Sequence, residues 1–96
     1  MNDELLANAR AVARFLARET GLQVGAPRFD EERGAVILPF QSLAGREHRI
    51  ALAADLLAER SPEELQPLLR ENWVPDKMKH PAYETLLVTS EGIESF

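Results

Sequence analysis

The feature that most restricts the fold is an apolar face, repeated at three- and four-residue spacing along residues 3–20. This spacing places the following side chains on one side of an α-helix: Leu5, Leu6, Ala9, Val12, Ala13 and Leu16. Asn2 or Asp3 can cap the start of the helix, and Gly21 can end it by adopting a positive φ angle. Because most of a helix's stability comes from packing its apolar face, the remaining sequence must supply a layer that covers it.

Segments of strand length follow and can form that layer. Residues 22–29 alternate loosely between apolar and polar side chains, residues 30–34 resemble a turn ending at Gly34, and residues 35–40 are continuously apolar. This pattern predicts a β-hairpin. Pro39 has no backbone N–H to donate to a neighbouring strand, so we expect it at a strand end or on a sheet edge.

Residues 46–59 fit two interpretations. His48, Ile50 and Leu52 alternate as in a strand, whereas Ile50, Ala53 and Leu57 also fall on one side of a helix. We favour a strand as far as about residue 53, followed by a short helical turn over residues 55–59.

The clearest local signal starts at Ser61. Ser61 can cap a helix, Pro62 suits its first position, and Glu64 completes a capping box. We expect this helix to fade near residue 72, with Pro67 removing one backbone hydrogen bond. A loop over residues 73–82, a strand over 83–89 and a short pairing over 93–96 complete the predicted elements.

These elements predict one α+β domain over residues 1–96, in the order α-β-β-β-α-β(-β). We expect a small antiparallel sheet of three to five strands, packed by two helices. Because residues 35–40 are apolar on both sides of their strand, we also expect the second face to be at least partly covered. A second copy of the chain would cover it, so a homodimer is part of the prediction.

Composition narrows the classes of function. The net charge of −5 opposes binding to a phosphate backbone. The absence of cysteine excludes disulfides, thiol catalysis and cysteine-ligated zinc. The acidic residues 1–4 do not resemble a secretory signal, and no apolar run approaches the ~18 residues needed to cross a membrane, so we expect a cytoplasmic protein without membrane association.

The residues that could perform catalysis are sparse. His48 and His80 are far apart in sequence, and neither has a second histidine at a metal-ligand spacing. We interpret His48 as a packing or edge residue and His80 as solvated. No glycine-rich phosphate loop or nucleophile elbow is present. The sequence therefore predicts no enzyme activity, no cofactor and no metal.

One segment combines side chains that are common in protein interfaces. Within eleven residues it holds the single Trp, the single Tyr and both lysines: Trp73, Lys77, Met78, Lys79, His80 and Tyr83. Trp, Tyr and Met are typical of surfaces that partners bury, and two flanking prolines stiffen the segment. We predict a partner-binding site here; the alternative is that Trp73 and Tyr83 close the end of a small core.

The first helix offers two further candidates. Phe15 lies about 120° from the centre of the apolar face, so it is either at the edge of the core or an exposed contact for a second chain. Arg10, Arg14 and Arg18 recur at every fourth residue. They either face solvent and pair with nearby carboxylates, or form a ridge that docks an acidic partner or a nucleic acid.

The leading hypothesis is a non-enzymatic protein-interaction module of the adaptor, small-chaperone or inhibitor/immunity type. The element order resembles that of small acidic secretion chaperones, and the resemblance implies a protein partner. Double-stranded-RNA-binding domains also have the order α-β-β-β-α, which makes a nucleic-acid-binding domain the alternative. A third hypothesis is an accessory subunit of an enzyme that uses His48 or His80 for proton transfer.

Overall fold

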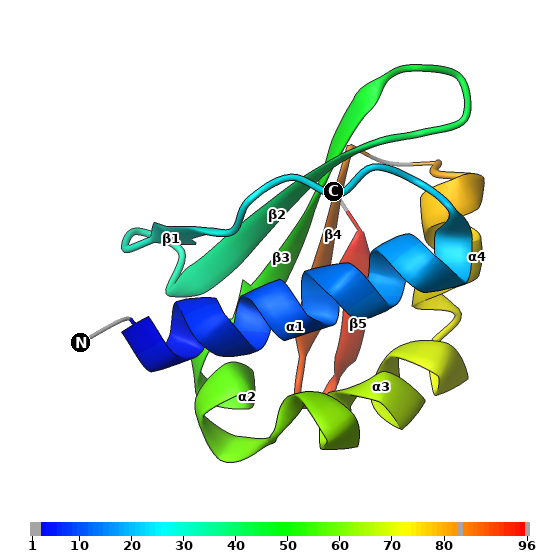
Figure 1. Cartoon of the computed structure of the whole chain (residues 1–96). Coiled ribbons are helices and arrows are strands. Elements are labelled where there is room, and N and C mark those ends of the chain that lie inside the picture. Colours follow the sequence, from blue (N-terminus) through cyan, green and yellow to red (C-terminus); the bar gives the residue numbers. More distant parts are fainter. Residues whose placement is uncertain (1–2, 83, 96) are drawn as a thin grey trace.

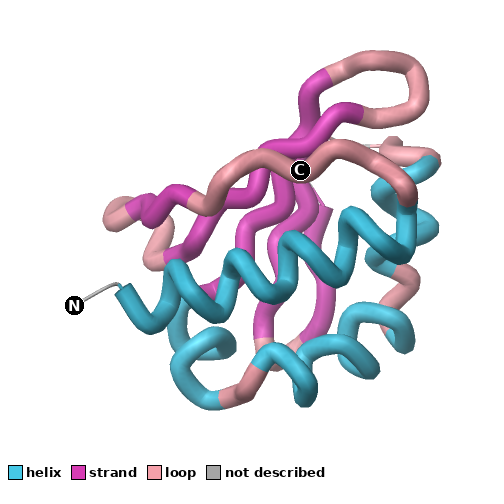
Figure 2. Tube along the Cα trace, in the orientation of Figure 1, coloured by secondary structure: helices cyan, strands magenta, loops and turns pink. Residues whose placement is uncertain are grey.

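The computed structural model describes residues 3–82 and 84–95, without the side chain of Ser95. The chain forms two layers, a five-stranded sheet and a layer of helices that packs on one face of it (Figure 1, Figure 2). The elements are, in chain order, α1 (Asp3–Thr20), β1 (Arg28–Asp30), β2 (Ala35–Gln41), β3 (Glu47–Ala53), α2 (Ala54–Glu59), α3 (Pro62–Glu71), α4 (Val74–Lys79), β4 (Thr85–Thr89) and β5 (Gly92–Ser95).

The strands lie in the order β1-β2-β3-β4-β5, as they occur in the sequence. The predicted α+β class and element order are confirmed. The expectation of an antiparallel sheet holds for every pair except β3 and β4, which run parallel. The reason is the connection between them: it passes through α2, α3 and α4 and returns to the sheet in the same direction, as a parallel pair requires.

Local signals explain most of the helix layer. The N–H of Glu64 donates to Ser61 Oγ at 3.2 Å, and the N–H of Ser61 donates to Glu64 Oε1 at 3.0 Å, so the capping box is present. The strand preferred for residues 46–53 and the helical turn after it are also confirmed, as β3 and α2. From α3, Leu65 and Leu69 reach the core.

Two expected elements differ from the structure. Residues 22–29 are not a continuous strand: only β1 pairs with the start of β2, and Val24 forms an isolated bridge with Phe40. The ladder is interrupted beside Pro39, which has no N–H and accepts a 2.7 Å hydrogen bond from the N–H of Gly25. A Cβ atom at Gly25 would lie 2.8 Å from Pro39 Cγ, so this close approach requires glycine.

The segment 73–82, predicted as a loop, contains α4. Pro75 occupies the second position of this helix, where a missing N–H costs nothing because the first N–H groups of a helix have no partner within it. Pro75 therefore starts a helix here instead of stiffening the predicted loop.

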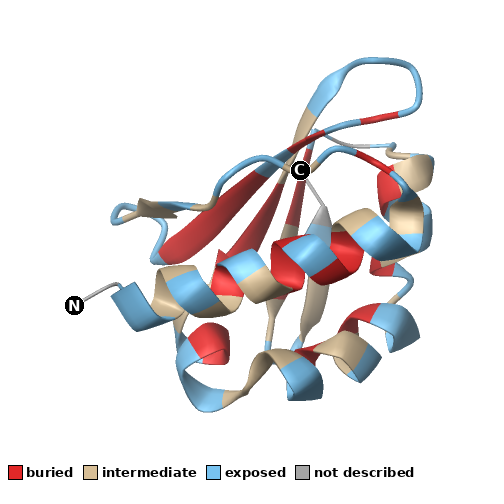
Figure 3. Cartoon of the chain, viewed as in Figure 1, coloured by how far each residue is buried: buried red, intermediate tan, exposed pale blue. Residues whose placement is uncertain are grey.

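Buried residues run along the central strands and recur on the helices (Figure 3), and the two faces of the sheet belong to different clusters. On the helix side, Val36, Leu38, Ile50 and Leu52 join the main core with residues from all four helices. On the other side, a separate small cluster holds Ala35, Ile37 and Ala51, with Leu87 packed against it, and it includes no helix residue. We call this second surface the open face.

Candidate functional site

Trp73 lies at the junction of α3 and α4 with its side chain in solvent. Its exposed fraction is 66%, and that of Leu43, in the β2–β3 loop, is 69%; these are the only large exposed hydrophobic residues in the described part of the chain. Exposed side chains of this size are typical of protein contacts. The sequence drew attention to Trp73 and missed Leu43, although an unaccompanied leucine in a polar loop is a signal of the same kind.

The backbone of Trp73 is strained. Its φ angle of 61° and ψ angle of 27° are left-handed, and no other non-glycine residue in ranges 3–82 and 84–95 has a positive φ. Trp73 directly follows the C-cap of α3, a position that usually holds glycine. A side chain in this conformation costs about 1–2 kcal/mol. Such strain persists where surrounding structure fixes the residue, and it clusters at functional sites.

Hydrogen bonds fix this residue between the two helices. The N–H of Trp73 donates to the carbonyl oxygen of Arg70 at 3.1 Å, and the N–H of Lys77 donates to the carbonyl oxygen of Trp73 at 2.9 Å. Trp73 therefore ends one helix and starts the next, which holds its indole in a defined place before any partner arrives. This preorganisation lowers the entropy lost on binding.

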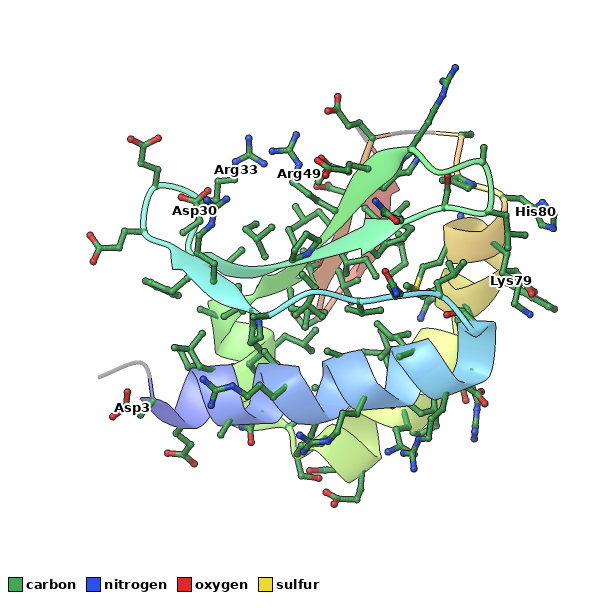
Figure 4. All side chains as sticks on the ribbon, turned by 45° about the horizontal axis from the view of Figure 1, so that its top comes forward. Asp3, Asp30, Arg33, Arg49, Lys79 and His80 are labelled. Carbon is green, nitrogen blue, oxygen red and sulfur yellow. The ribbon has the colours of Figure 1, made fainter. Side chains whose placement is uncertain are left out.

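A hollow of about 970 Å³ lies at the other end of α4, between the β2–β3 loop and the connection to β4. Arg46, His48, Lys79 and His80 line it, so the fold brings together two histidines that are distant in sequence. Figure 4 shows Lys79 and His80 next to each other at the end of α4. Sequence reasoning could not find this pairing because it depends on how the β2–β3 hairpin is placed beside α4.

Two carboxylates, those of Glu47 and Glu84, also line the hollow, and Glu84 forms an ion pair. Glu84 Oε1 lies 3.3 Å from Arg49 Nη2 in an ion pair. The ring of His48 stacks on Phe40 with centroids 5.5 Å apart, and His48 is half-buried while His80 is exposed. The lining therefore combines the cations Arg46 and Lys79 with the carboxylates Glu47 and Glu84, and Arg46 and Lys79 can donate hydrogen bonds to carboxylate groups of a ligand.

Two candidate contact residues are in the core and not on the surface. Phe15 is only 3% exposed because it belongs to the main core, and the guanidinium carbon of Arg70 lies 5.1 Å from its ring centroid. Arg70 is held by Glu19, with Nε and Oε1 2.7 Å apart, and this hydrogen bond keeps the pKa of the Glu19 carboxyl below its usual value. Met78 is fully buried, since it lies on the inner side of α4.

The remaining candidates are distributed as follows. Lys77 and the arginines at positions 10, 14 and 18 are exposed, and Lys79 is half-buried. Helices α1 and α4 are in contact, so the C-terminal end of the arginine ridge lies beside α4. Tyr83 lies outside the described residues.

We use the name α4 surface for Trp73, which precedes α4, together with four residues that line the hollow at its other end, Leu43, Arg46, Lys79 and His80. Among the described residues, no three His, Cys, Asp or Glu side chains gather in a way that could hold a metal ion. No helix in ranges 3–82 and 84–95 is long and apolar enough to cross a membrane. Comparisons with protein-family models, curated proteins and solved structures found no match.

Proposed function

We propose that the protein is a non-enzymatic, cytoplasmic protein-interaction module of the adaptor, small-chaperone or inhibitor/immunity type, and that its partner docks on the α4 surface. The observation that carries this proposal is the conformation of Trp73. The largest side chain in the protein stands in water on a strained backbone, which are two unfavourable features at one residue. A partner that buries the indole would offset both.

The lining of the neighbouring hollow indicates the chemistry of that partner. Trp73 offers an apolar contact at the start of α4 and Leu43 offers one in the hollow at its other end, where Arg46 and Lys79 add positive charge. A segment that carries an apolar side chain near acidic residues fits this arrangement. Since the protein as a whole has a charge of −5, it repels acidic chains in general, so binding of such a segment depends on local positive charge such as that of Arg46 and Lys79.

Site-specific photo-crosslinking in the native host tests the proposal. A photoreactive amino acid at position 73 or 43 is expected to give the same adduct with a second protein. The matched control is the exposed Glu59, the last residue of α2, a helix that lies on the other side of the molecule from α4 (Figure 1). No adduct at positions 43 and 73, or equal adducts at all three positions, contradicts the proposal.

A substitution then separates recognition from folding. Trp73→Ala is expected to remove the adduct formed through position 43, with the circular dichroism spectrum unchanged because the indole is not part of the core. Retention of the adduct by the folded variant would remove Trp73 from the site.

A nucleic-acid-binding domain is the alternative, supported by the exposed ridge of Arg10, Arg14 and Arg18 beside α4. It predicts binding to double-stranded RNA that weakens steeply as salt increases. Absence of binding at low salt eliminates it, whereas salt-sensitive binding lost on Arg14→Ala would favour it over the protein partner.

An enzyme's accessory subunit is the remaining alternative, because His48 and His80 share the hollow with Glu47 and Glu84. It predicts that the crosslinked partner is an enzyme whose pH–rate profile changes when His80 is replaced by Gln. An unchanged profile would leave the hollow with a binding role alone.

A further inference from the structure

The open face holds a hollow of about 430 Å³ on its central strands. Ala51 of β3 and Leu87 of β4 are aligned in the parallel ladder and form the apolar part of its lining. Thr85 lies two residues before Leu87 on the same strand and therefore points to the same face. Arg33, from the turn between β1 and β2, completes the lining. A volume of this size, with an apolar lining and a few polar groups, is within the range of small-molecule sites.

Thr85 brings an unsatisfied hydroxyl group to this hollow. The residue is only 5% exposed, and its hydroxyl has no hydrogen-bond partner within residues 3–82 and 84–95. In the same ranges, every fully enclosed side-chain nitrogen or oxygen has a partner, so Thr85 Oγ1 must be reachable from the hollow. Buried polar groups are normally hydrogen-bonded, and a hydroxyl can serve as donor or acceptor. A ligand in the hollow would supply the partner that the fold does not.

The charged groups closest to the hollow are already paired. Arg33 Nε lies 3.6 Å from Asp30 Oδ2, and Arg49 Nη2 lies 3.3 Å from Glu84 Oε1. Arg49 is aligned with Thr85 in the ladder, so its ion pair lies on the same face. A charged ligand would have to compete with these two ion pairs.

The surroundings of the hollow also oppose both signs of charge. An adjoining hollow of about 540 Å³ includes the carboxylates of Asp55, Glu91 and Glu94, which would repel an anion. Arg33 lines both hollows and would repel a cation. An uncharged ligand avoids both penalties.

Arg33 suits an uncharged ligand that is aromatic. A guanidinium group is planar and stacks on the face of an aromatic ring. The Arg33 side chain is 55% exposed even with its ion pair formed, and Figure 4 shows it on the side of the sheet opposite to α1. Arg33 can therefore cover a flat ring that rests on Ala51 and Leu87.

We propose that this hollow binds an uncharged, planar aromatic molecule that carries one hydrogen-bonding group. The ring rests on Ala51 and Leu87, the guanidinium group of Arg33 stacks on its outer face, and its polar atom forms a hydrogen bond with Thr85 Oγ1. The site shares no residue with the α4 surface, so it adds a small-molecule ligand to the proposed protein partner.

Indole is a suitable probe for the intact chain, since it is planar and uncharged and has one N–H donor. We expect it to shift the backbone amide signals of Ala51, Thr85 and Leu87 in NMR spectra, with saturation at a millimolar Kd, because so small a probe makes few contacts. Tryptamine and indole-3-acetate carry the same ring with a positive or a negative charge. Each should bind more weakly than indole.

Removing either half of the hydrogen bond tests the role of Thr85. Thr85→Val should weaken the binding of indole about fivefold and leave that of 1-methylindole unchanged, because the methylated probe has no N–H to donate. The matched control is Thr20→Val, at the half-buried end of α1, which should change neither Kd. Circular dichroism checks that each variant keeps the fold.

Two substitutions of Arg33 separate stacking from charge. Arg33→Ala and Arg33→Lys should both weaken the binding of indole about threefold, because lysine keeps the charge but lacks the planar group. Binding that Arg33→Lys retains in full would contradict the stacked arrangement.

The absence of saturable shifts at Ala51, Thr85 and Leu87 overturns the proposal. Tighter binding of tryptamine or indole-3-acetate than of indole overturns it as well, and so does an equal effect of Thr85→Val on both uncharged probes. If the same amide signals shift with protein concentration alone, a second copy covers the face and the proposal is wrong. None of these results affects the α4 surface, which is tested by crosslinking at positions 43 and 73.

Discussion

Helix α3 begins and ends in opposite ways. At its start, Ser61 and Glu64 exchange two hydrogen bonds, so unpaired N–H groups of the first turn find partners. At its end, Trp73 takes a left-handed conformation that glycine would adopt without strain, and its indole lies in solvent. One end is optimised for stability, while the other carries strain and an exposed aromatic side chain. Because functional sites often break local rules of stability, the C-terminal end of α3, at Trp73, is the end of this helix at which we expect a function.

A substitution in the middle of α3 gives the largest expected loss of stability, against which changes at its two ends can be compared. Leu69 is fully buried in the main core, so Leu69→Ala is expected to lower the free energy of unfolding by about 2–5 kcal/mol. Leu68 precedes it and is half-buried, and Leu68→Ala should cost clearly less. Urea denaturation followed by circular dichroism measures both; equal losses would mean that the inner side of α3 is misassigned.

Removing the side-chain cap at Ser61 should destabilise the start of α3. Ser61→Ala is expected to lower the free energy of unfolding by about 1 kcal/mol, because the N–H of Glu64 loses its side-chain acceptor and keeps only the carbonyl oxygen of Ser61. Ser90→Ala, in the exposed turn between β4 and β5, is the control and should change it by less than about 0.5 kcal/mol. A Ser61→Ala variant as stable as the wild type contradicts this role of the cap.

At the other end, glycine and alanine should differ in the reverse of their usual order. Both substitutions remove the indole of Trp73, but only alanine keeps a Cβ atom in the left-handed conformation. We therefore expect Trp73→Gly to be more stable than Trp73→Ala by about 1 kcal/mol, measured by thermal unfolding. If the alanine variant is the more stable one, the backbone at residue 73 is not strained as described.

The contribution of Glu64 to the stability of the fold should depend on pH. Hydrogen bonds from the backbone and side chain of Ser61 hold the pKa of Glu64 below its usual value of 4.5. A carboxyl group whose pKa is lower in the folded state stabilises the fold above the unfolded pKa, and this contribution is lost as the pH falls through the folded value. The stability difference between the wild type and Glu64→Gln should therefore shrink below pH 4.5.

Added salt should distinguish the stability contribution of Glu64 from that of Glu19, which pairs with Arg70 near the C-terminal end of α3. There the pKa of Glu19 is lowered chiefly by its hydrogen bond with the exposed Arg70. The stability difference between wild type and Glu19→Gln should decrease in the same pH window and also with added salt. Stability differences that do not depend on pH would contradict both assignments.

The sequence predicts features that depend on neighbouring residues and fails where distant segments meet. Ser61 and Glu64 are three positions apart, and the apolar run of β2 is continuous, so both were readable. The parallel pairing of β4 with β3 depends on the path of three helices, and the shared hollow of His48 and His80 depends on that path too. The left-handed conformation of Trp73 was not predictable, because glycine is the residue that signals it.

The central claim is that Trp73 is held in solvent, free for a partner to bury, and its fluorescence tests this directly. The chain has one tryptophan, so emission reports on this residue alone. Acrylamide quenching of the folded protein is expected to approach the efficiency measured in concentrated urea, with little change in emission wavelength on unfolding. Quenching several-fold weaker in the folded protein, with blue-shifted emission, would place the indole in a core and contradict the claim.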